Sequence, residues 1–501
     1  PYGCVEQTTS RFIPALLVNK IVKKSGVNFD KLSPDKQGIE MTKFLDKRNS
    51  NPVYNTALLN DMVTEGLKRL YTFQNSDGGF GWWSGFESDN YMSTYVTYSL
   101  ILAKQSDYSI DNSVLERALN FVATKFNSDD QIYDRLYMAY VLSMEKKINA
   151  DKLEQFFKQR DSLNNYGKAL LSLAYFNLGD KAKADLICQN LKTFATIDET
   201  SGTASWKNDT KFYWYWYGDR IETNTFVFKA FMKSRPNDKV TPMIAKWLLE
   251  NREGNHWYST KDTANTIYAL TEYAEINKEL NPDYTLSVFY NNKLLKKIKV
   301  NKENMFDFDN SIQLEEKDLD NSQGKIKIVR EGKGNLYYSA TAEYFSLEEN
   351  IKAASNMIAV NRDYYKLSEK KDKDNKIAYD KTLIKDGDIL KSGDLVEVKL
   401  TVKSNNDYEY LIFEDMKPAG LEATEVNSGY VYQNGISLSR EIRDEKNVFF
   451  ANDLAQGTQI ITYNLRAEVP GKFHALPTKS YAMYAPQIRA NSDEKVIQVT
   501  D

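Results

Sequence analysis

The sequence predicts a multidomain α and β protein, in which a helical part precedes antiparallel β-sandwich domains. Three observations carry this prediction. The chain has 501 residues, too many for one ordinary hydrophobic core. Apolar residues recur at helical spacing as far as Asn281-Pro282 and alternate with polar residues beyond it. A weak internal repeat in the first part is typical of helix pairs that stack on one another.

Amphipathic helices are predicted at several places in residues 1–280. One is Ser113–Phe126, where apolar residues follow helical spacing at Val114, Leu115, Ala118, Leu119 and Val122. Further helices are predicted over Ser10–Lys23, Asp134–Lys146, Asn165–Leu178 and Lys181–Lys192. Glycine ends helices readily, so Gly179 between the last two segments predicts a tight αα-hairpin.

The internal repeat consists of a tryptophan, an acidic residue a few positions later and then a helix-like run. It occurs at Gln74–Trp83 with Asp89, at Trp214–Trp216 with Glu222, and at Trp257–Asp262. An acid at a helix start accepts hydrogen bonds from free backbone amides and suits the helix dipole. Repeated helix pairs of this kind predict a closed or solenoidal array, in which the glycine turns and tryptophans pack helices.

Alternation of apolar and polar residues predicts β-strands in the rest of the chain. It is clearest in 286–290, 336–344, 396–402 and 461–469. In the last two segments one face is apolar and the other polar, as in an antiparallel sandwich with one solvated face.

The composition argues against several classes of function. A net charge of −3 gives no indication of a nucleic-acid or membrane-surface partner. No run approaches the roughly 18–20 apolar residues of a membrane span. Cys4 and Cys188 can pair only once, and we expect Cys188 to be a small buried hydrophobe. With only His256 and His474 available, we expect no metal site and no cofactor.

The first seven residues, Pro1-Tyr2-Gly3-Cys4-Val5-Glu6-Gln7, carry the most specific chemistry in the chain. A Cys-x-x-Gln pair can close a small ring when the thiolate displaces ammonia from the glutamine amide. The product is an internal thioester, which acylates amines and water readily. The heptapeptide resembles the thioester motif of the α2-macroglobulin and complement family, usually Pro-Tyr-Gly-Cys-Gly-Glu-Gln. Val5 replaces the second glycine, as an apolar residue often does in bacterial members.

Other segments extend the resemblance over nearly the whole chain. The turn at 74–83 is similar to turns of α/α toroids, and 257–263 to the last helix pair of the family's thioester domain. These imply an α/α toroid thioester domain at residues 1–280. The family's arrangement implies the C-terminal part of a CUB-like β-sandwich at 281–347. Asp415–Gly420, Gly471–Phe473 and Ala482–Pro486 resemble the final macroglobulin-like β-sandwich, which we place at 348–501.

The resemblance also implies roles for individual residues. Cys4 supplies the sulfur and Gln7 the carbonyl of the bond. Gly3 permits a tight turn, and Val5 can screen the ring from water. A helix start would stabilise a leaving thiolate by roughly 0.3–1 kcal/mol. We expect a helix-dipole or packing role for Glu6, which lies in the same first turn.

The bond must be kept dry until it reacts. In the resembled bacterial proteins the final macroglobulin-like domain covers the thioester, and the matching positions here are Met483 and Tyr484. Tyr2 is a possible second wall.

The expected function is broad-spectrum protease inhibition, without enzymatic turnover. A target protease would cut a bait region, and a protease lysine would then attack the Gln7 carbonyl and become covalently bound. Because the chain begins at Pro1, we expect it to be the C-terminal piece of a longer protein, with the bait region upstream. We also expect a periplasmic or cell-surface location with a lipid anchor on the preceding segment. Some relatives use a histidine to favour hydroxyl targets; we expect His256 to be structural and amines to be preferred.

Two other functions fit parts of the sequence. A thioester can anchor an adhesion or tagging module to a surface. An α/α toroid can also be an enzyme, but Asp129-Asp130 lacks the spacing of the cyclase acid motif, and Cys188 with two distant histidines is a poor zinc site. Paired carboxylates for glycoside hydrolysis remain possible among 69 acidic residues.

Overall fold

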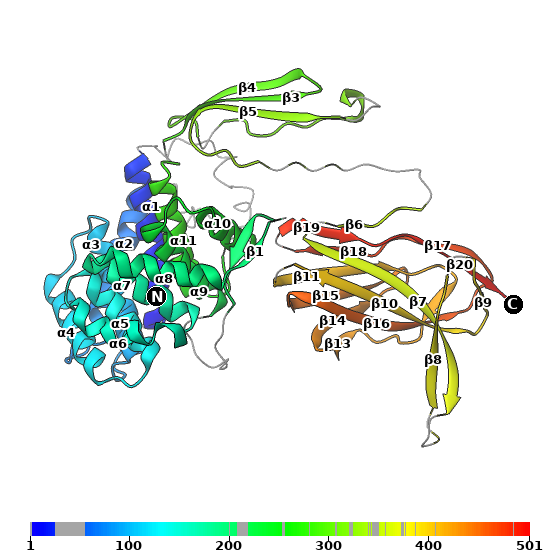
Figure 1. Ribbon diagram of the computed structural model, residues 1–501, viewed down its shortest axis with the longest axis horizontal. Helices are drawn as coiled ribbons and strands as arrows, with labels where there is room; N and C mark the ends of the chain where they lie inside the picture. The colour runs from blue at the N-terminus through cyan, green and yellow to red at the C-terminus, as the bar shows by residue number, and fades with distance from the viewer. Residues whose placement is uncertain are drawn as a thin grey trace. The chain divides into compact units, whose positions relative to one another are not determined.

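The computed structural model describes residues 3–25 and 56–501, apart from 200, 208–218, 253–255, 280, 306–307, 320–323, 339, 341, 343–349, 356, 372–374, 376, 386, 406 and 484. The chain divides into two compact units. The first contains the helices and a small β-sheet, and the second is a β-sandwich (Figure 1).

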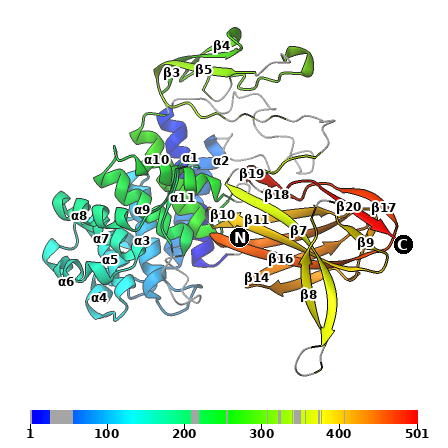
Figure 2. The same ribbon diagram turned by 45° about the vertical axis from the view of Figure 1, so that its right-hand side comes forward.

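Helices of the first unit form a closed ring. Its members are α1 (Val5–Ser25), α3 (Asn90–Gln105), α5 (Ile132–Met144), α7 (Asn165–Leu178), α9 (Arg220–Ser234) and α11 (Thr260–Ile276). Each of these helices packs on the next, and α11 packs on α1. Neighbours in the ring are joined through other helices, as an α/α toroid requires. The predicted fold class is therefore confirmed (Figure 2).

The remaining helices are shorter or lie beside the ring. α2 (Thr56–Thr72) packs on α1, α4 (Asn112–Ser128) on α3 and α5, and α8 (Lys181–Thr193) on α7 and α9. The others are α6 (Glu154–Lys158), α10 (Val240–Glu250) and the 3-10 turns Ala150–Leu153, Arg160–Ser162 and Glu316–Asp318.

Local sequence explains where several helices begin and end. Asp89 accepts a hydrogen bond from the Met92 amide at the start of α3, and Gly179 ends α7 in the left-handed region with φ 94°. The helices predicted at 113–126, 134–146, 165–178 and 181–192 correspond to α4, α5, α7 and α8. The helix predicted over Ser10–Lys23 corresponds to α1, which begins at Val5, inside the motif where the resemblance implied a helix start.

The interior of the ring is aromatic and polar as well as apolar. Tyr91, Tyr95 and Tyr98 lie at the i, i+4 and i+7 positions of α3 and are buried. Lys229 of α9 is also buried, and its ammonium group donates a hydrogen bond to the Tyr98 hydroxyl. The rings of Tyr98, Tyr140, Phe226 and Tyr268 face this ammonium, with centroids 4.7–5.4 Å from Nζ.

The small sheet of the first unit has the order β4-β3-β5 and is antiparallel. Its strands are β3 (Asp283–Tyr290), β4 (Lys293–Asn301) and β5 (Ile326–Lys333). The strand predicted over 336–344 is not found in the described part of that segment, where Leu336–Tyr338 lie outside any strand. Alternation alone does not make a strand, because a strand also needs a neighbour for its backbone hydrogen bonds. Residues 339, 341, 343 and 344 lie outside the described residues.

Three larger sheets make up most of the described part of the second unit. The five-stranded sheet contains, in order, β12 (Leu421–Ala423), β16 (Gly457–Ala467), β10 (Leu395–Ser404), β7 (Ile358–Lys371) and β8 (Ile377–Leu383). The seven-stranded sheet contains β13 (Gly429–Gln433), β14 (Ile436–Ile442), β15 (Lys446–Leu454), β11 (Tyr408–Met416), β18 (Lys479–Ala482), β19 (Ala485–Asn491) and β6 (Ala354–Ser355). The third contains β17 (Gly471–Ala475), β20 (Lys495–Thr500) and β9 (Ile389–Lys391). A separate two-stranded sheet consists of β1 (Thr196–Asp198) and β2 (Thr203–Ser205).

The sandwich core follows the predicted alternation. Val396, Val398, Leu400 and Val402 of β10 are all buried, and β10 pairs antiparallel with β16. One ion pair lies inside this core. Arg362 donates to Asp415 at 2.7 Å, and both side chains are fully buried.

Lys229 should make the stability of the protein depend on pH. Burial lowers its pKa to about 7; Glu272 opposes this change, and Lys233 adds to it. Between about pH 7 and the ordinary lysine value near 10.5, the unfolded chain holds a proton that the folded chain does not. The free energy of unfolding should therefore rise with pH in this window, by up to about 1.4 kcal/mol per pH unit.

Replacement Lys229→Met should remove this slope and stabilise the protein most at and below about pH 7. Urea unfolding between about pH 6 and about pH 9 measures it. Lys246→Met, at an exposed position of α10, is the control and should keep the slope. Equal slopes in all three proteins would contradict the prediction.

Candidate functional site

The Cys4–Gln7 segment forms the start of α1. Cys4 directly precedes the helix, and Gln7 lies in its first turn. The Gln7 backbone amide donates a hydrogen bond to Cys4 Sγ at 3.4 Å, so the thiol caps the helix. Gly3 lies against the Gln7 side chain, because a methyl group added at Gly3 would stand 3.4 Å from Gln7 Oε1. The structure thus brings the two predicted reacting residues into one turn.

The two reacting groups differ in exposure. Cys4 is 9% exposed, and Val5 beside it is fully buried. Gln7, in contrast, is exposed. A nucleophile from solvent can therefore approach the Gln7 side-chain carbonyl, while the sulfur is shielded and lies against the amides of the helix start.

Three hydrogen bonds fix the position of this turn. The Val5 amide donates to the Trp82 carbonyl at 3.0 Å, and Arg69 of α2 donates to the Gly3 carbonyl at 3.2 Å. The Thr8 hydroxyl donates to the Cys4 carbonyl at 3.0 Å. The helix start is therefore held by α2 and by the turn before α3.

Glu6 points into the helical ring and is 3% exposed. Its Oε1 atom accepts hydrogen bonds from Ser10 at 2.6 Å and from Thr260 of α11 at 2.8 Å. The Ser10 hydroxyl lies 3.0 Å from the Tyr95 hydroxyl of α3. Glu6 thus bonds Ser10 of its own helix and Thr260 of α11, and it is linked to Tyr95 of α3 only through Ser10.

A buried ion pair lies next to these residues, at the start of α11. Lys261 follows Thr260 and donates to Glu222 of α9 at 2.7 Å, with both side chains buried. Burial alone would lower the pKa of Lys261, but Glu222, Asp262 and Asp219 raise it above its ordinary value. Lys261 is therefore a permanent cation that links the first turns of α9 and α11.

The other predicted site residues have different outcomes. Tyr2 and Tyr484 lie outside the described residues. Met483 belongs to the second unit, directly follows β18 and is 45% exposed. Sequence reasoning did not single out Ser10, Tyr95 or Thr260 as contacts of the motif. Thr260 belongs to a segment already matched to a helix pair, but nothing in the sequence pairs it with Glu6.

Two further groups lie away from the motif. Cys188 is fully buried beside Ser172, which confirms its expected place in the core. Burial raises the pKa of the Cys188 thiol to about 11. His256 lies in the turn before α11, where Nδ1 is 2.9 Å from the Trp257 carbonyl.

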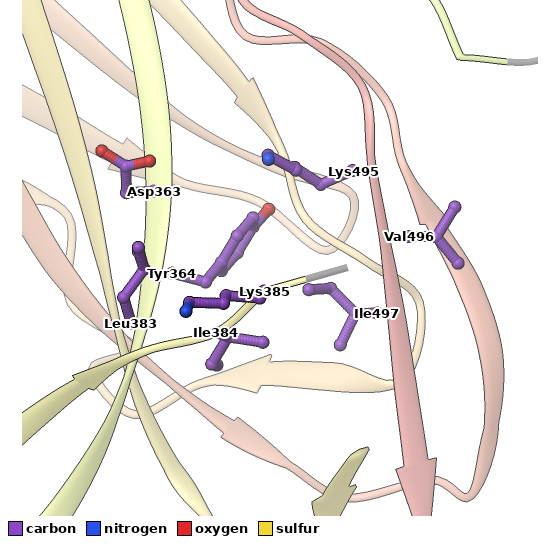
Figure 3. A pocket seen from close by; sticks show the side chains of 8 residues that line it. All are labelled: Asp363, Tyr364, Leu383, Ile384, Lys385, Lys495, Val496 and Ile497. Carbon is purple, nitrogen blue, oxygen red and sulfur yellow. The ribbon is translucent and has the colours of Figure 1, made fainter. Parts of the chain in front are cut away.

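No metal or membrane site is found in the part of the chain that the structure describes. There, no group of three histidine, cysteine or acidic side chains is placed to hold a metal ion. None of the described helices has the length and hydropathy of a membrane span. A pocket of about 170 Å³ in the sandwich is lined by Tyr364, Lys495 and Ile497, among others. None of the predicted site residues lines it (Figure 3).

Two family models match the sequence. One, described as the A-macroglobulin TED domain, matches residues 1–152 and 134–273. The other, described as the bacterial alpha-2-macroglobulin MG10 domain, matches residues 358–487. The chain belongs to the α2-macroglobulin family. Its TED-domain match covers the helical ring, and the MG10 match covers most of the sandwich.

Relatives of the family share low identity with this chain. The alpha-2-macroglobulin of Escherichia coli is 24% identical over an alignment of 528 positions, gaps included. The alignment covers 98% of this chain and 28% of that protein. The alpha-2-macroglobulin of Thermotoga maritima is 24% identical over 388 residues, covering 76% and 19% respectively. The solved structure of trypsin-activated Escherichia coli alpha-2-macroglobulin matches with a TM-score of 0.49 and 16% identity, covering 100% of this chain and 32% of that one. The chain thus spans less than a third of these relatives.

Cys188 should be unreactive in the folded protein, because it is fully buried and its thiol pKa is raised. Iodoacetamide at neutral pH should leave Cys188 unmodified until the protein is unfolded. Peptide mass mapping measures the labelling. A Cys188→Ala variant should show the same native thiol count as the unchanged protein, and rapid native labelling of Cys188 would refute the prediction.

Proposed function

We propose that this chain carries the reactive part of a protease inhibitor, an internal thioester between Cys4 and Gln7. The observation that carries the proposal is the shared helical turn, with the Gln7 side chain exposed and the Cys4 sulfur shielded. In the forming step the Cys4 thiolate attacks the Gln7 side-chain carbonyl carbon. The C–N bond breaks, and the amide nitrogen leaves as ammonia after taking up a proton.

The thioester then reacts once with an amine. A lysine amine of a target protease attacks the same carbonyl carbon and the C–S bond breaks. An amide forms between Gln7 and the lysine, and Cys4 becomes a free thiolate. The helix start supports this step, because its backbone amides and dipole stabilise the leaving sulfur. No group is regenerated, so the reaction is single-use and differs from enzymatic turnover.

The exposed carbonyl needs a cover until it reacts, because water is far more concentrated than any target amine. We propose Met483 and Tyr484 for this cover. The support is that Met483 is 45% exposed and directly follows β18, where Ala482 pairs with Ala485 of β19. Its backbone amide donates to the Tyr410 carbonyl at 2.9 Å, which fixes the base of the side chain. A thioether is apolar and adaptable, as a water-excluding cover requires.

The wider setting is also a proposal. We assign the β4-β3-β5 sheet to part of a CUB-like sandwich, because most of its residues are at least partly exposed and a lone three-stranded sheet buries little apolar surface. The alpha-2-macroglobulin relatives support protease targets. A periplasmic or cell-surface location follows from that use.

The thioester should be visible in the intact mass of the freshly prepared protein. A closed ring leaves the chain one ammonia lighter. Methylamine should then add to Gln7 and release a single thiol, that of Cys4. Cys4→Ala and Gln7→Ala variants should show neither the mass loss nor the adduct. An unchanged mass with no adduct in the unaltered protein would refute the thioester.

Covalent capture should require lysine amines on the target. We expect a serine protease to form an adduct in which Gln7 is joined to a protease lysine, as seen by tandem mass spectrometry. The same protease with its lysines dimethylated is the control and should form none, because a tertiary amine cannot yield a stable amide. Dominant capture of glycerol hydroxyls, or no protease adduct beside a reactive thioester, would favour the adhesion function.

A further inference from the structure

We propose that Thr260 and Ser10 are positioning residues for the thioester, acting through Glu6. This inference rests on the proposed function. Neither hydroxyl is part of the Cys4–Gln7 ring, but both bond the one carboxylate that lies between the two reacting residues. Their task is to fix the rotation of the first turn of α1.

Hydrogen-bond chemistry gives the network a defined direction. The Ser10 and Thr260 hydroxyls both donate to Glu6 Oε1. Ser10 then has no further hydrogen to give, so Tyr95 must donate to Ser10 across their 3.0 Å contact. Burial, followed by nearby carboxylates that include Glu6, raises the pKa of Tyr95 well above its ordinary value. Tyr95 therefore keeps the proton that it donates.

The network joins three helices that are far apart in the sequence. Glu6 and Ser10 lie one turn apart on α1, Tyr95 lies on α3, and Thr260 is the first residue of α11. Glu6 and Thr260 are 254 positions apart in sequence. Their hydrogen bond closes the ring between its first and last helices. Lys261, the residue after Thr260, pairs with Glu222 of α9. This ion pair holds the start of α11, and with it Thr260, in place.

The orientation of Glu6 acts on that of Gln7, together with the bonds that hold the backbone of Gly3 and Val5. Successive residues of an α-helix are about 100° apart around its axis. With Glu6 held inward, Gln7 is exposed to solvent, while its backbone amide donates to the sulfur that caps the same turn. Ring closure between two side chains depends steeply on such positioning, and a misplacement of about 1 Å can cost on the order of 100-fold in rate.

The test compares two threonines of α11, of which Thr260 is exposed and Thr266 is buried. Thr260→Val removes the bond to Glu6 while keeping the side-chain shape. Thr266→Val is the control, because the buried Thr266 hydroxyl lies 2.9 Å from that of Thr225 in α9, so its hydrogen bond joins α11 to α9 and does not involve Glu6. Each change removes one hydrogen bond between ring helices, and Thr266→Val, at the buried position, should lower the melting temperature at least as much as Thr260→Val.

The readout is the fraction of chain that is one ammonia lighter, with the rate of methylamine incorporation. Thr260→Val and Ser10→Ala should each lower the thioester fraction or its formation rate by about 10-fold or more. Thr260→Ser should restore it, and Thr266→Val should leave it unchanged. Equal thioester levels in Thr260→Val, Thr266→Val and the unaltered protein would overturn the positioning role. Absence of the bond in the unaltered protein would overturn the proposed function itself, so the two failures are distinguishable.

Discussion

The hydrogen bond from Thr260 to Glu6 joins the first and last helices of the ring, and in our proposal it positions the Cys4–Gln7 turn. A Cys-x-x-Gln sequence brings the two side chains near each other in any helix. It does not decide which of the two faces solvent. That choice needs a contact with the rest of the fold, and the buried Glu6 carboxylate provides it. In the function that we propose, the toroid acts on the chemistry by fixing the rotation of one helical turn.

The interior of the ring shows that this toroid is not built for maximum stability. Burying a charge is unfavourable unless it is paired and hydrogen-bonded, and breaking a buried pair typically costs about 3–5 kcal/mol. The Glu222–Lys261 pair satisfies this condition, whereas Lys229 is held mainly by aromatic faces. Polar contacts of this kind are directional, so they favour one register of neighbouring helices over others. A ring that must place a reactive turn accurately gains from that specificity.

The sequence predicted the features that have a short-range cause. Helical spacing located α7 and α8, and Gly179 marked the turn between them. Alternation located β10, because one of its faces is buried along its whole length. The heptapeptide placed Cys4 and Gln7 together for the same reason, since they are three residues apart. The partners of Glu6 could not be predicted, because only the closure of the ring brings Thr260 to α1. Alternation at 336–338 misled for the opposite reason, since strand pairing is a long-range property that this segment does not achieve.

The exposure of Cys4 and Gln7 indicates which step the turn can support and which step its surroundings must control. The shielded sulfur and the helix start favour departure of the thiolate, whichever nucleophile attacks. Water and amines reach the exposed Gln7 side chain from the same side, so the turn itself has no means to tell them apart. Discrimination must therefore come from when the carbonyl becomes accessible, and from how close an amine already is at that moment. A removable cover meets the first condition and a bound protease the second. An exposed thioether such as that of Met483 suits a cover that must leave, because apolar contact resists water yet carries no directional bond that would have to break.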